Sequence, residues 1–335
     1  MASAEPRPGR RRDEAKVFSI QHFCLHDGPG VRSLIFFKGC PLRCSWCQNP
    51  ESWDTGPELA FKARLCIGCG TCRLVCSHGA IRVPAHPWRD PSRCRGCFTC
   101  AEKCPTGALS RFGEPVTVDG LVEEVRPEFP LYRSSGGGVT LSGGEPTLQP
   151  EFAAALAGRL RSYGVSVAVE TCGLFDMDGS GAVRDLLNNV DLVLFDVKVY
   201  DEESFGRLCG GGGTGAGKAA SRIRDNLMAL ADGLGSRRGP RVWPRLPLIP
   251  GMTDGRENLA AWAGFLRKAG FGGLTIVPYH ALGESKRVWL GLDRGPALAA
   301  PAAEDVEAAA GIFRSVGIRV FSPGEEAWEA GTRAG

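Results

Sequence analysis

The chain has 335 residues, a formal net charge of +3 and 43% hydrophobic residues. This length fits one large domain with a smaller module, or two domains. The small charge excess gives no reason to expect a nucleic-acid partner, and no run approaches the ~18 apolar residues that a membrane-spanning helix needs. We therefore expect no nucleic-acid partner and no membrane segment.

The N-terminal stretch concentrates the basic residues. They are Arg7, Arg10, Arg11, Arg12 and Lys16. The arginines at 10–12 could belong to a twin-arginine export signal, but the following DEAKVFSIQHFCLHDG has neither an apolar stretch nor a small-residue cleavage site. We expect residues 1–16 to form a disordered basic tail.

Cysteine usage bears on location. Fourteen cysteines could indicate a secreted disulfide scaffold, but eleven of them fall into three tight arrays. Arrays of this kind bind iron–sulfur clusters, which indicates a reducing cytoplasm. Cys24, Cys172 and Cys209 stand outside the arrays, and we expect them to be small buried apolar side chains.

After the tail, VFSIQHF (residues 17–23) predicts a strand or an extended edge, and HDGPGVR (26–32) follows it. Asp-Gly-Pro-Gly is first of all a turn that feeds the chain into the next strand. The turn also brings the Asp27 carboxylate to that strand, so a structural and a functional role are both open for Asp27.

The first cysteine array lies in KGCPLRCSWCQNP, directly after the predicted buried strand 31–38. Cys40, Cys44 and Cys47 form a C-x3-C-x2-C pattern. Three thiolates hold three corners of a 4Fe–4S cluster and leave one iron open for another ligand. The alternative is a structural metal knot or half of a zinc site, but zinc needs a fourth ligand at finger-like spacing. The pattern favours a catalytic cluster.

Residues 61–108 carry the run C-x2-C-x2-C-x3-C twice. In two-cluster bacterial ferredoxins the fourth cysteine of each run ligates the cluster of the other run. We therefore assign one cluster to Cys66, Cys69, Cys72 and Cys104, and the other to Cys94, Cys97, Cys100 and Cys76. Ser77 after Cys76 and the long interval 77–93 depart from a minimal ferredoxin, but neither removes a ligand. A zinc ribbon would use two pairs of cysteines rather than two quartets.

From about residue 116 predicted strands alternate with predicted helices. The strands are Gly138–Leu141, Val165–Glu170, Asp191–Val197, Val242–Ile249, Leu274–Tyr279 and Ile318–Phe321, and the helices are 119–126, 151–163, 181–188, 218–232, 256–269 and 303–315. Buried β-branched strands between amphipathic helices indicate parallel βα units. The fold class is therefore α/β. We predict a partial (β/α)6 barrel at 17–60 and 109–335, with the bacterial-ferredoxin-like domain inserted at 61–108.

The ends of these strands carry polar residues. In SGGEP (142–146), Gly143 and Gly144 let the backbone approach a ligand closely, and Glu145 offers a carboxylate to an ammonium group. The predicted site also includes Glu170, Asp196 and Lys198 at the next two strand ends, Arg245 on the fifth strand and His280 after the sixth. In a barrel these ends meet at the catalytic face. For His280, a structural role and a cofactor contact are both open.

A glycine-rich run, GGGGTGAGK (210–218), nearly reads as a phosphate-binding loop. Ala219 stands where Ser or Thr should bind magnesium, and no buried strand precedes the run. We expect a flexible loop, which argues against a P-loop ATPase.

With these motifs the sequence resembles the radical S-adenosylmethionine enzymes that activate glycyl radical enzymes, in the subgroup with an inserted two-cluster ferredoxin domain. The resemblance runs from about Phe18 to about Val320. It is carried by HDGPGVR, GCPLRCSWCQNPES, SGGGVTLSGGEP, DLVLFDVK, PLIPGMTD and PYHALGESK. It implies an oxidoreductase that reductively cleaves S-adenosylmethionine to a 5′-deoxyadenosyl radical, which takes a Cα hydrogen from a glycine of a partner enzyme.

The resemblance also implies cofactors and residue roles. Three 4Fe–4S clusters are expected, with the amino and carboxylate groups of S-adenosylmethionine on the open iron of the Cys40, Cys44 and Cys47 cluster. The implied roles are Gly143, Gly144 and Glu145 at the amino group, Lys198 and Arg245 at the carboxylate, His280 near the nucleoside, Asp27 at the target glycine loop, and Glu170, Thr171 and Asp196 at a monovalent cation. The family position of Glu170 is Asp in the formate-lyase branch.

The implied partners are a glycyl radical enzyme as protein substrate and a flavodoxin or ferredoxin as electron donor, with the chain itself a monomer. The rival is a radical enzyme that acts on a small molecule or a peptide and needs no large protein partner. A second rival, an electron-transfer ferredoxin fused to a structural barrel, would not bind S-adenosylmethionine. These motifs do not choose among the glycyl radical enzymes.

Overall fold

The computed structural model describes residues 14–84, 88–177, 179, 181–210, 216–233 and 239–325. Residues 1–13 of the predicted tail and 211–215 of the glycine-rich loop lie outside these ranges. The last three tail residues are not a disordered arm, because β1 (Glu14–Cys24) begins at Glu14. Lys16 pairs with Pro115 of β5 (Glu114–Thr117), so the sheet continues three residues further than the sequence predicts.

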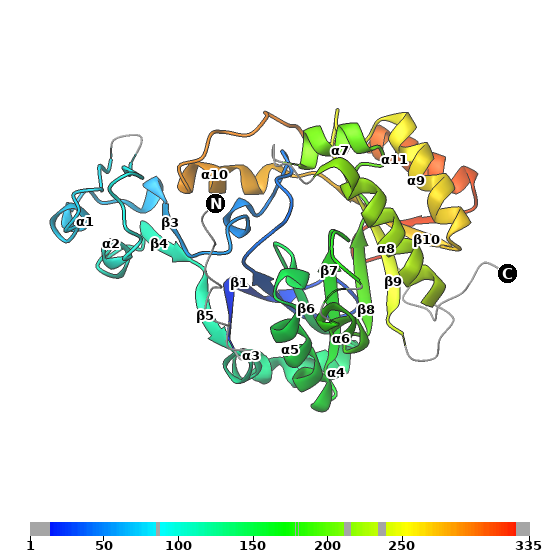
Figure 1. Ribbon diagram of the computed structural model, residues 1–335, viewed down its shortest axis with the longest axis horizontal. Coiled ribbons are helices and arrows are strands. Elements are labelled where there is room, and N and C mark those ends of the chain that lie inside the picture. Colours follow the sequence, from blue (N-terminus) through cyan, green and yellow to red (C-terminus); the bar gives the residue numbers. More distant parts are fainter. Residues whose placement is uncertain are drawn as a thin grey trace, which may run out of the picture.

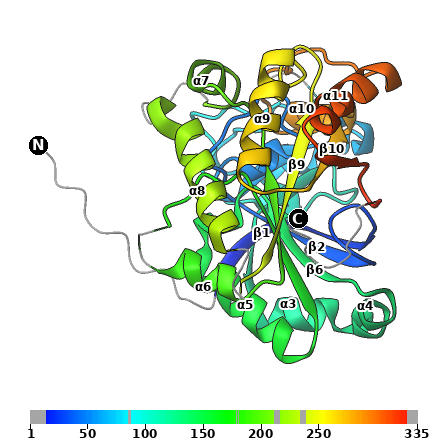
Figure 2. The ribbon, with the colours of Figure 1, turned by 90° about the vertical axis from the view of Figure 1, so that its right-hand side faces the viewer.

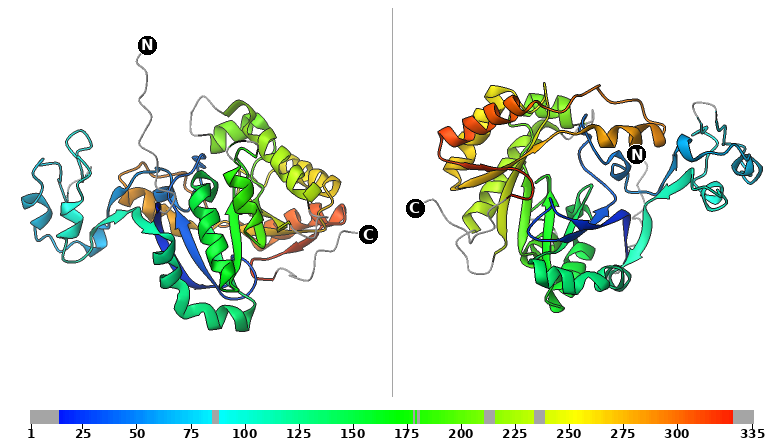
Figure 3. Two further views of the ribbon diagram at one scale, coloured as in Figure 1. Left: turned by 60° about the horizontal axis from the view of Figure 1, so that its bottom comes forward. Right: turned by 180° about the vertical axis from the view of Figure 1, so that it is seen from behind.

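Within the described residues, one curved sheet has nine strands in the order β11-β10-β9-β8-β7-β6-β2-β1-β5 (Figure 3). Seven neighbouring strands of this sheet run parallel. They are β2 (Arg32–Phe37), β6 (Gly138–Gly143), β7 (Ser166–Thr171), β8 (Leu192–Asp196), β9 (Arg241–Leu248), β10 (Gly273–Pro278) and β11 (Arg319–Phe321). Every residue of β2 is buried, as expected of a strand covered on both faces. The predicted partial α/β barrel is confirmed, extended at one edge by antiparallel β1 and β5.

Helices cover the outer face of this sheet (Figures 2 and 3). The inner face surrounds a cavity. The helices are α3 (Val118–Val125), α4 (Phe129–Ser135), α5 (Pro150–Ser162), α6 (Ala182–Asn188), α7 (Glu202–Cys209), α8 (Ala219–Gly233), α9 (Arg256–Lys268) and α11 (Ala303–Ser315). Six agree with the predicted helices to within about two residues. The sequence missed the short α4, α7 and α10 (Glu284–Trp289), whose lengths give little periodic signal.

The cysteine-rich segment projects from one side of the barrel (Figure 1). Its strands β3 (Glu58–Phe61) and β4 (Leu109–Phe112) pair antiparallel and join it to β5, and its helices α1 (Thr71–Leu74) and α2 (Thr99–Glu102) have one turn each. Among the described residues of this segment, ten form a separate buried apolar core that holds it together, and two of the ten are cysteines. Such a core is small for a module that must fold on its own.

Helix α10 lies between the barrel and this insert (Figure 1). Lys62 of the insert places its ammonium 5.3 Å from the centre of the Trp289 ring. On the other side, the Lys286 ammonium contacts Glu51 at 2.7 Å and Asn49 at 2.7 Å, next to the first cysteine array. The insert is therefore fixed against the loop that holds Cys40, Cys44 and Cys47.

Candidate active site

A cavity of about 570 Å³ opens at the carboxyl ends of the parallel strands. This volume suits a nucleotide-sized ligand. Predicted site residues from seven segments line it: Asp27, Cys40, Cys44, Cys47, Gly143, Gly144, Glu170, Asp196, Lys198, Arg245 and His280. The structure thus brings together residues separated by more than 250 positions in the sequence.

The loop with the first array is held at both ends and in the middle. The Gly39 N–H donates to the carbonyl of Ser52 at 2.7 Å, which closes the loop. The backbone N–H of Arg43 donates to the carbonyl of Cys209 at 2.8 Å, at the end of α7. Lys38, 1% exposed, donates from its ammonium to the Glu51 carbonyl at 2.6 Å and to the Glu58 carboxylate at 2.5 Å. The three thiols therefore lie on a rigid support.

Burial keeps these thiols neutral when nothing is bound to them. It raises the pKa of Cys40 and raises the pKa of Cys47 to about 12. A hydrogen bond with the Cys209 thiol, together with burial, raises the pKa of Cys44. Thiolates form here when a metal's positive charge compensates the burial.

The donor set fits a cluster better than a single zinc ion. In the described part of the chain, no three His, Cys, Asp or Glu side chains converge closely enough to hold one ion. A 4Fe–4S cluster needs soft thiolates spaced around a larger group. The buried indole N–H of Trp53 interacts with the Cys47 thiol and partly offsets the rise in pKa that burial causes there, so it could donate to the sulfur of a bound cluster.

Gly143 and Gly144 serve strand packing. A Cβ at Gly144 would lie 2.1 Å from the Gly39 carbonyl oxygen, and one at Gly143, where φ is +111°, would lie 2.3 Å from the Phe37 nitrogen. Instead, the Glu145 N–H donates to the Gly39 carbonyl at 2.8 Å. The glycines thus let the end of β6 lie against the start of the cysteine loop, and because both also line the cavity, the predicted close approach to a ligand stays a prediction.

The Glu145 carboxylate does not line the cavity. Its side chain is fully buried, and it accepts hydrogen bonds from the Thr171 hydroxyl at 2.9 Å and the Cys172 N–H at 2.8 Å. The Thr147 hydroxyl donates a further bond at 2.8 Å. The predicted contact of this carboxylate with an ammonium group stays a prediction, and the structure shows that the carboxylate already has these three donors. Glu145 ties the ends of β6 and β7 together, because a buried carboxylate needs several donors.

Two ion pairs face the cavity. The Lys198 ammonium lies 2.6 Å from the Asp196 carboxylate, and the Arg245 guanidinium pairs with Glu170 and lies 3.8 Å from Asp27. Burial by itself lowers the pKa of Lys198, but the Asp196 carboxylate outweighs burial, so that the pKa is raised and Lys198 stays charged. Burial raises the pKa of Glu170 to about 7, helped by the neighbouring charges of Asp27 and Asp196.

The segment before α10 closes the far wall of the cavity. His280 stacks with Tyr279 at a ring separation of 6.5 Å, and both line the cavity. The Gly283 N–H donates to the Gln48 side chain at 2.9 Å, and a Cβ at Gly283 would lie 2.6 Å from the Gln48 Cα. The sequence analysis missed this contact, and Lys286 with it, because their partners lie about 235 positions away.

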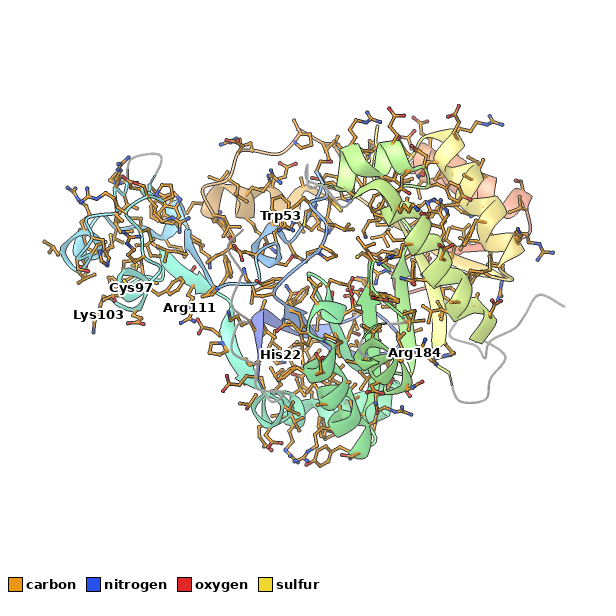
Figure 4. The ribbon with its side chains drawn as sticks, viewed as in Figure 1. His22, Trp53, Cys97, Lys103, Arg111 and Arg184 are labelled. Atoms are coloured by element: carbon orange, nitrogen blue, oxygen red, sulfur yellow. The ribbon has the colours of Figure 1, made fainter. Side chains whose placement is uncertain are left out.

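The insert brings its cysteines into two groups of four. A cavity of about 110 Å³ is lined by Cys66, Cys69, Cys72 and Cys104. The thiol of Cys100 interacts electrostatically with Cys76, Cys94 and Cys97, and burial together with these neighbours raises its pKa to about 11. These are the two sets that the crossed ferredoxin pattern predicts. Figure 4 shows Cys97 on the insert, away from the barrel.

Family models match three parts of the chain. The model of the radical SAM superfamily matches residues 91–263, that of a 4Fe-4S single cluster domain matches 26–67, and that of a 4Fe-4S dicluster domain matches 65–108. The choline trimethylamine-lyase activating enzyme of Oleidesulfovibrio alaskensis is 38% identical over 88% of this chain and 94% of its own. The chain belongs to the activating enzymes of glycyl radical enzymes. It is thus a radical SAM oxidoreductase whose protein substrate is a glycyl radical enzyme.

Other activating enzymes are similarly related. Pyruvate formate-lyase 2-activating enzyme of Escherichia coli is 36% identical over 84% of this chain and 83% of its own, and benzylsuccinate synthase activating enzyme of Thauera aromatica is 38% identical over 82% and 81%. A solved domain of a pyruvate-formate lyase-activating enzyme from Bacteroides vulgatus covers 56% of the chain at a TM-score of 0.43 and 24% identity. Among the described residues, no helix is both long and apolar enough to cross a bilayer.

Proposed function

We propose that Cys40, Cys44 and Cys47 hold the cluster at which this activating enzyme cleaves S-adenosylmethionine, and that the cavity of about 570 Å³ binds that nucleotide. The main support for this proposal is that three thiols, the cations of Lys198 and Arg245 and the exposed imidazole of His280 all line the same cavity. When bound and reduced, the cluster supplies the electron for cleavage of the sulfonium. The residues that line the cavity would bind, orient and shield the nucleotide.

Lys198 and Arg245 would bind the carboxylate of the methionine part. Each already has a carboxylate partner, Asp196 for Lys198 and Glu170 for Arg245, so both are held in place before the ligand arrives. An arginine binds a carboxylate with two parallel hydrogen bonds and therefore also fixes its orientation. The backbone at Gly143 and Gly144 would receive the amino group, and His280 would lie against the nucleoside.

We place the proposed monovalent cation beside Glu170, Thr171 and Asp196. The raised pKa of Glu170 reflects burial and then the nearby Asp27 and Asp196 charges, and a cation relieves that repulsion. The Arg245 guanidinium meets part of this need already, and the Ser142 hydroxyl donates to the same carboxylate. A cation would share the site with these two groups.

Asp27 would position the partner's glycine loop at the cavity. Its side chain is 23% exposed, and the Thr140 hydroxyl donates to its backbone carbonyl at 2.7 Å, which fixes the turn. We further propose that the insert holds two 4Fe–4S clusters that relay electrons from a flavodoxin or ferredoxin, and that the enzyme acts as a cytoplasmic monomer. The thiols must remain reduced for ligation, which favours that compartment.

The test is S-adenosylmethionine binding by Lys198→Ala and Arg245→Ala, with Arg184→Ala as the control on the outer helix α6. Loss of a buried charged hydrogen bond should weaken binding about 10- to 100-fold in each site variant. Unchanged affinity in both would remove the proposed carboxylate site. If 5′-deoxyadenosine forms but no partner radical does, the rival small-molecule or peptide enzyme is favoured.

A further inference from the structure

The exposed large apolar side chains of the described residues fall into two groups. Phe23, Leu25, Leu148, Leu282 and Val288 lie on segments that line or flank the active-site cavity and its cysteine loop, where a protein substrate must bind. The second group is Leu65, Ile67 and Leu74, on the insert. Because these three residues do not line the active-site cavity, binding of the protein substrate there does not explain their exposure.

The second group surrounds one cluster site. Leu65 is 46% exposed, Ile67 69% and Leu74 87%. Leu65 and Leu74 flank the run from Cys66 to Cys72, and Ile67 lies within it. Ile67 lines the cavity of about 110 Å³ that the thiols of Cys66, Cys69, Cys72 and Cys104 share. Cys69 itself is exposed. Apolar side chains exposed next to a redox site indicate a surface that a protein covers transiently.

This surface is basic. The insert, residues 61–108, has eight Lys or Arg against two Asp or Glu, whereas the whole chain has a net charge of only +3. Arg64 and Arg73 are exposed beside Leu65 and Leu74, and within the described ranges neither forms an ion pair. Loaded clusters would each offset roughly two positive charges, but inside the insert rather than on its surface.

We propose that Arg64, Leu65, Ile67, Arg73 and Leu74 form a carrier face that docks an acidic one-electron carrier protein. The carrier would lose one electron and a cluster held by Cys66, Cys69, Cys72 and Cys104 would gain it, with no bond formed or broken. This inference rests on the proposed relay role of the insert. A basic rim steers an acidic partner and the small apolar centre keeps the complex short-lived, as electron-transfer encounters require. A second copy of this chain would present like charges to the same face.

The experiment measures anaerobic reduction of the reconstituted enzyme by stopped flow. The probe is a reduced acidic flavodoxin, and the loss of cluster absorbance is followed at several salt concentrations. Arg64→Glu/Arg73→Glu should lower the second-order rate at low salt by at least about tenfold and flatten its salt dependence. Leu74→Ser keeps the charge and should slow reduction at every salt concentration.

The matched control is Arg184→Glu/Arg222→Glu, on α6 and α8; Figure 4 shows Arg184 on the side of the molecule opposite the insert. The second-order rate of reduction of this control should stay within about twofold of that of the unmodified enzyme. Iron content and 5′-deoxyadenosine formation with dithionite, which needs no docking, should be equal in all variants. A normal flavodoxin rate and salt slope in both carrier-face variants would overturn the proposal. Failure of the unmodified enzyme to form 5′-deoxyadenosine with dithionite would instead overturn the proposed function.

Discussion

The two cysteine regions of this molecule differ in burial and in the size of the apolar core that supports them. The thiols of Cys40, Cys44 and Cys47 are held by a large core, and burial raises the pKa of Cys40 and Cys47. In the insert, Cys69 and Cys97 are exposed, and hydrogen bonds with Thr71 and Thr99, respectively, lower their pKa. We therefore expect the barrel to support its cluster and the proposed clusters of the insert to support the insert. Four changes break or sharpen this contrast.

The largest effect is expected from Cys44→Ala. Loss of one of three ligands should reduce 5′-deoxyadenosine formation with dithionite to background, because each of the three loop thiolates holds one corner of the cluster. The measurement is chromatography of anaerobic reactions. Cys97→Ala, in the insert, is the matched control and should keep most of the dithionite-driven activity. An equal loss of 5′-deoxyadenosine formation in both variants would contradict the separate roles of the cysteine loop and the insert.

Removal of iron by a chelator should unfold the insert and leave the barrel folded. The insert core has ten buried residues, and a structural metal supplies folding free energy to such small modules. Hydrogen exchange should show lost protection in residues 66–108 and retained protection in β6, β7 and β8. Retained protection in the insert would mean that its protein core is sufficient alone.

Gly144→Ala should damage the barrel's support for the first array. The added Cβ would lie 2.1 Å from the Gly39 carbonyl oxygen, so β6 and the cysteine loop must separate. We expect a loss of about 2–4 kcal/mol in the free energy of unfolding, with less iron bound at that loop. Gly264→Ala is the control, because Gly264 is exposed on α9 and a Cβ there meets nothing within 4 Å, so the substitution should stabilise the helix by roughly 0.5–1 kcal/mol.

The smallest effect concerns pH. In the folded chain Glu170 has a pKa of about 7, above its ordinary 4.5, so the folded state binds the proton more tightly and stability falls as pH rises through that range. Glu170→Gln should remove about 1–3 kcal/mol of this pH dependence, measured by urea unfolding of the cluster-free chain. Glu203→Gln, on exposed α7, should leave it unchanged. If the proposed cation binds, potassium should flatten the slope of the unmodified chain as well.

Much of this contrast could be predicted from the sequence. The spacing of the cysteines and the alternation of strands and helices predicted the partial barrel, the cysteine loop and the insert, because these signals are local. The roles of Gly144 and Glu145 needed coordinates, since a glycine and a carboxylate at a strand end fit a ligand contact and a packing contact equally well. Lys286 and Gln48 escaped notice because their contacts join segments about 235 positions apart. Cys209 is a small buried side chain, as expected, but its thiol also hydrogen-bonds with Cys44, which the sequence does not indicate.

The most direct test of the central claim is electron paramagnetic resonance of the reduced, reconstituted enzyme with and without S-adenosylmethionine. A Cys66→Ala/Cys94→Ala variant simplifies the spectrum by weakening the insert clusters. If the cluster at Cys40, Cys44 and Cys47 has an iron open to the nucleotide, its signal should shift when S-adenosylmethionine is added, and Cys44→Ala should abolish that shift. A spectrum that the nucleotide leaves unchanged would contradict the account.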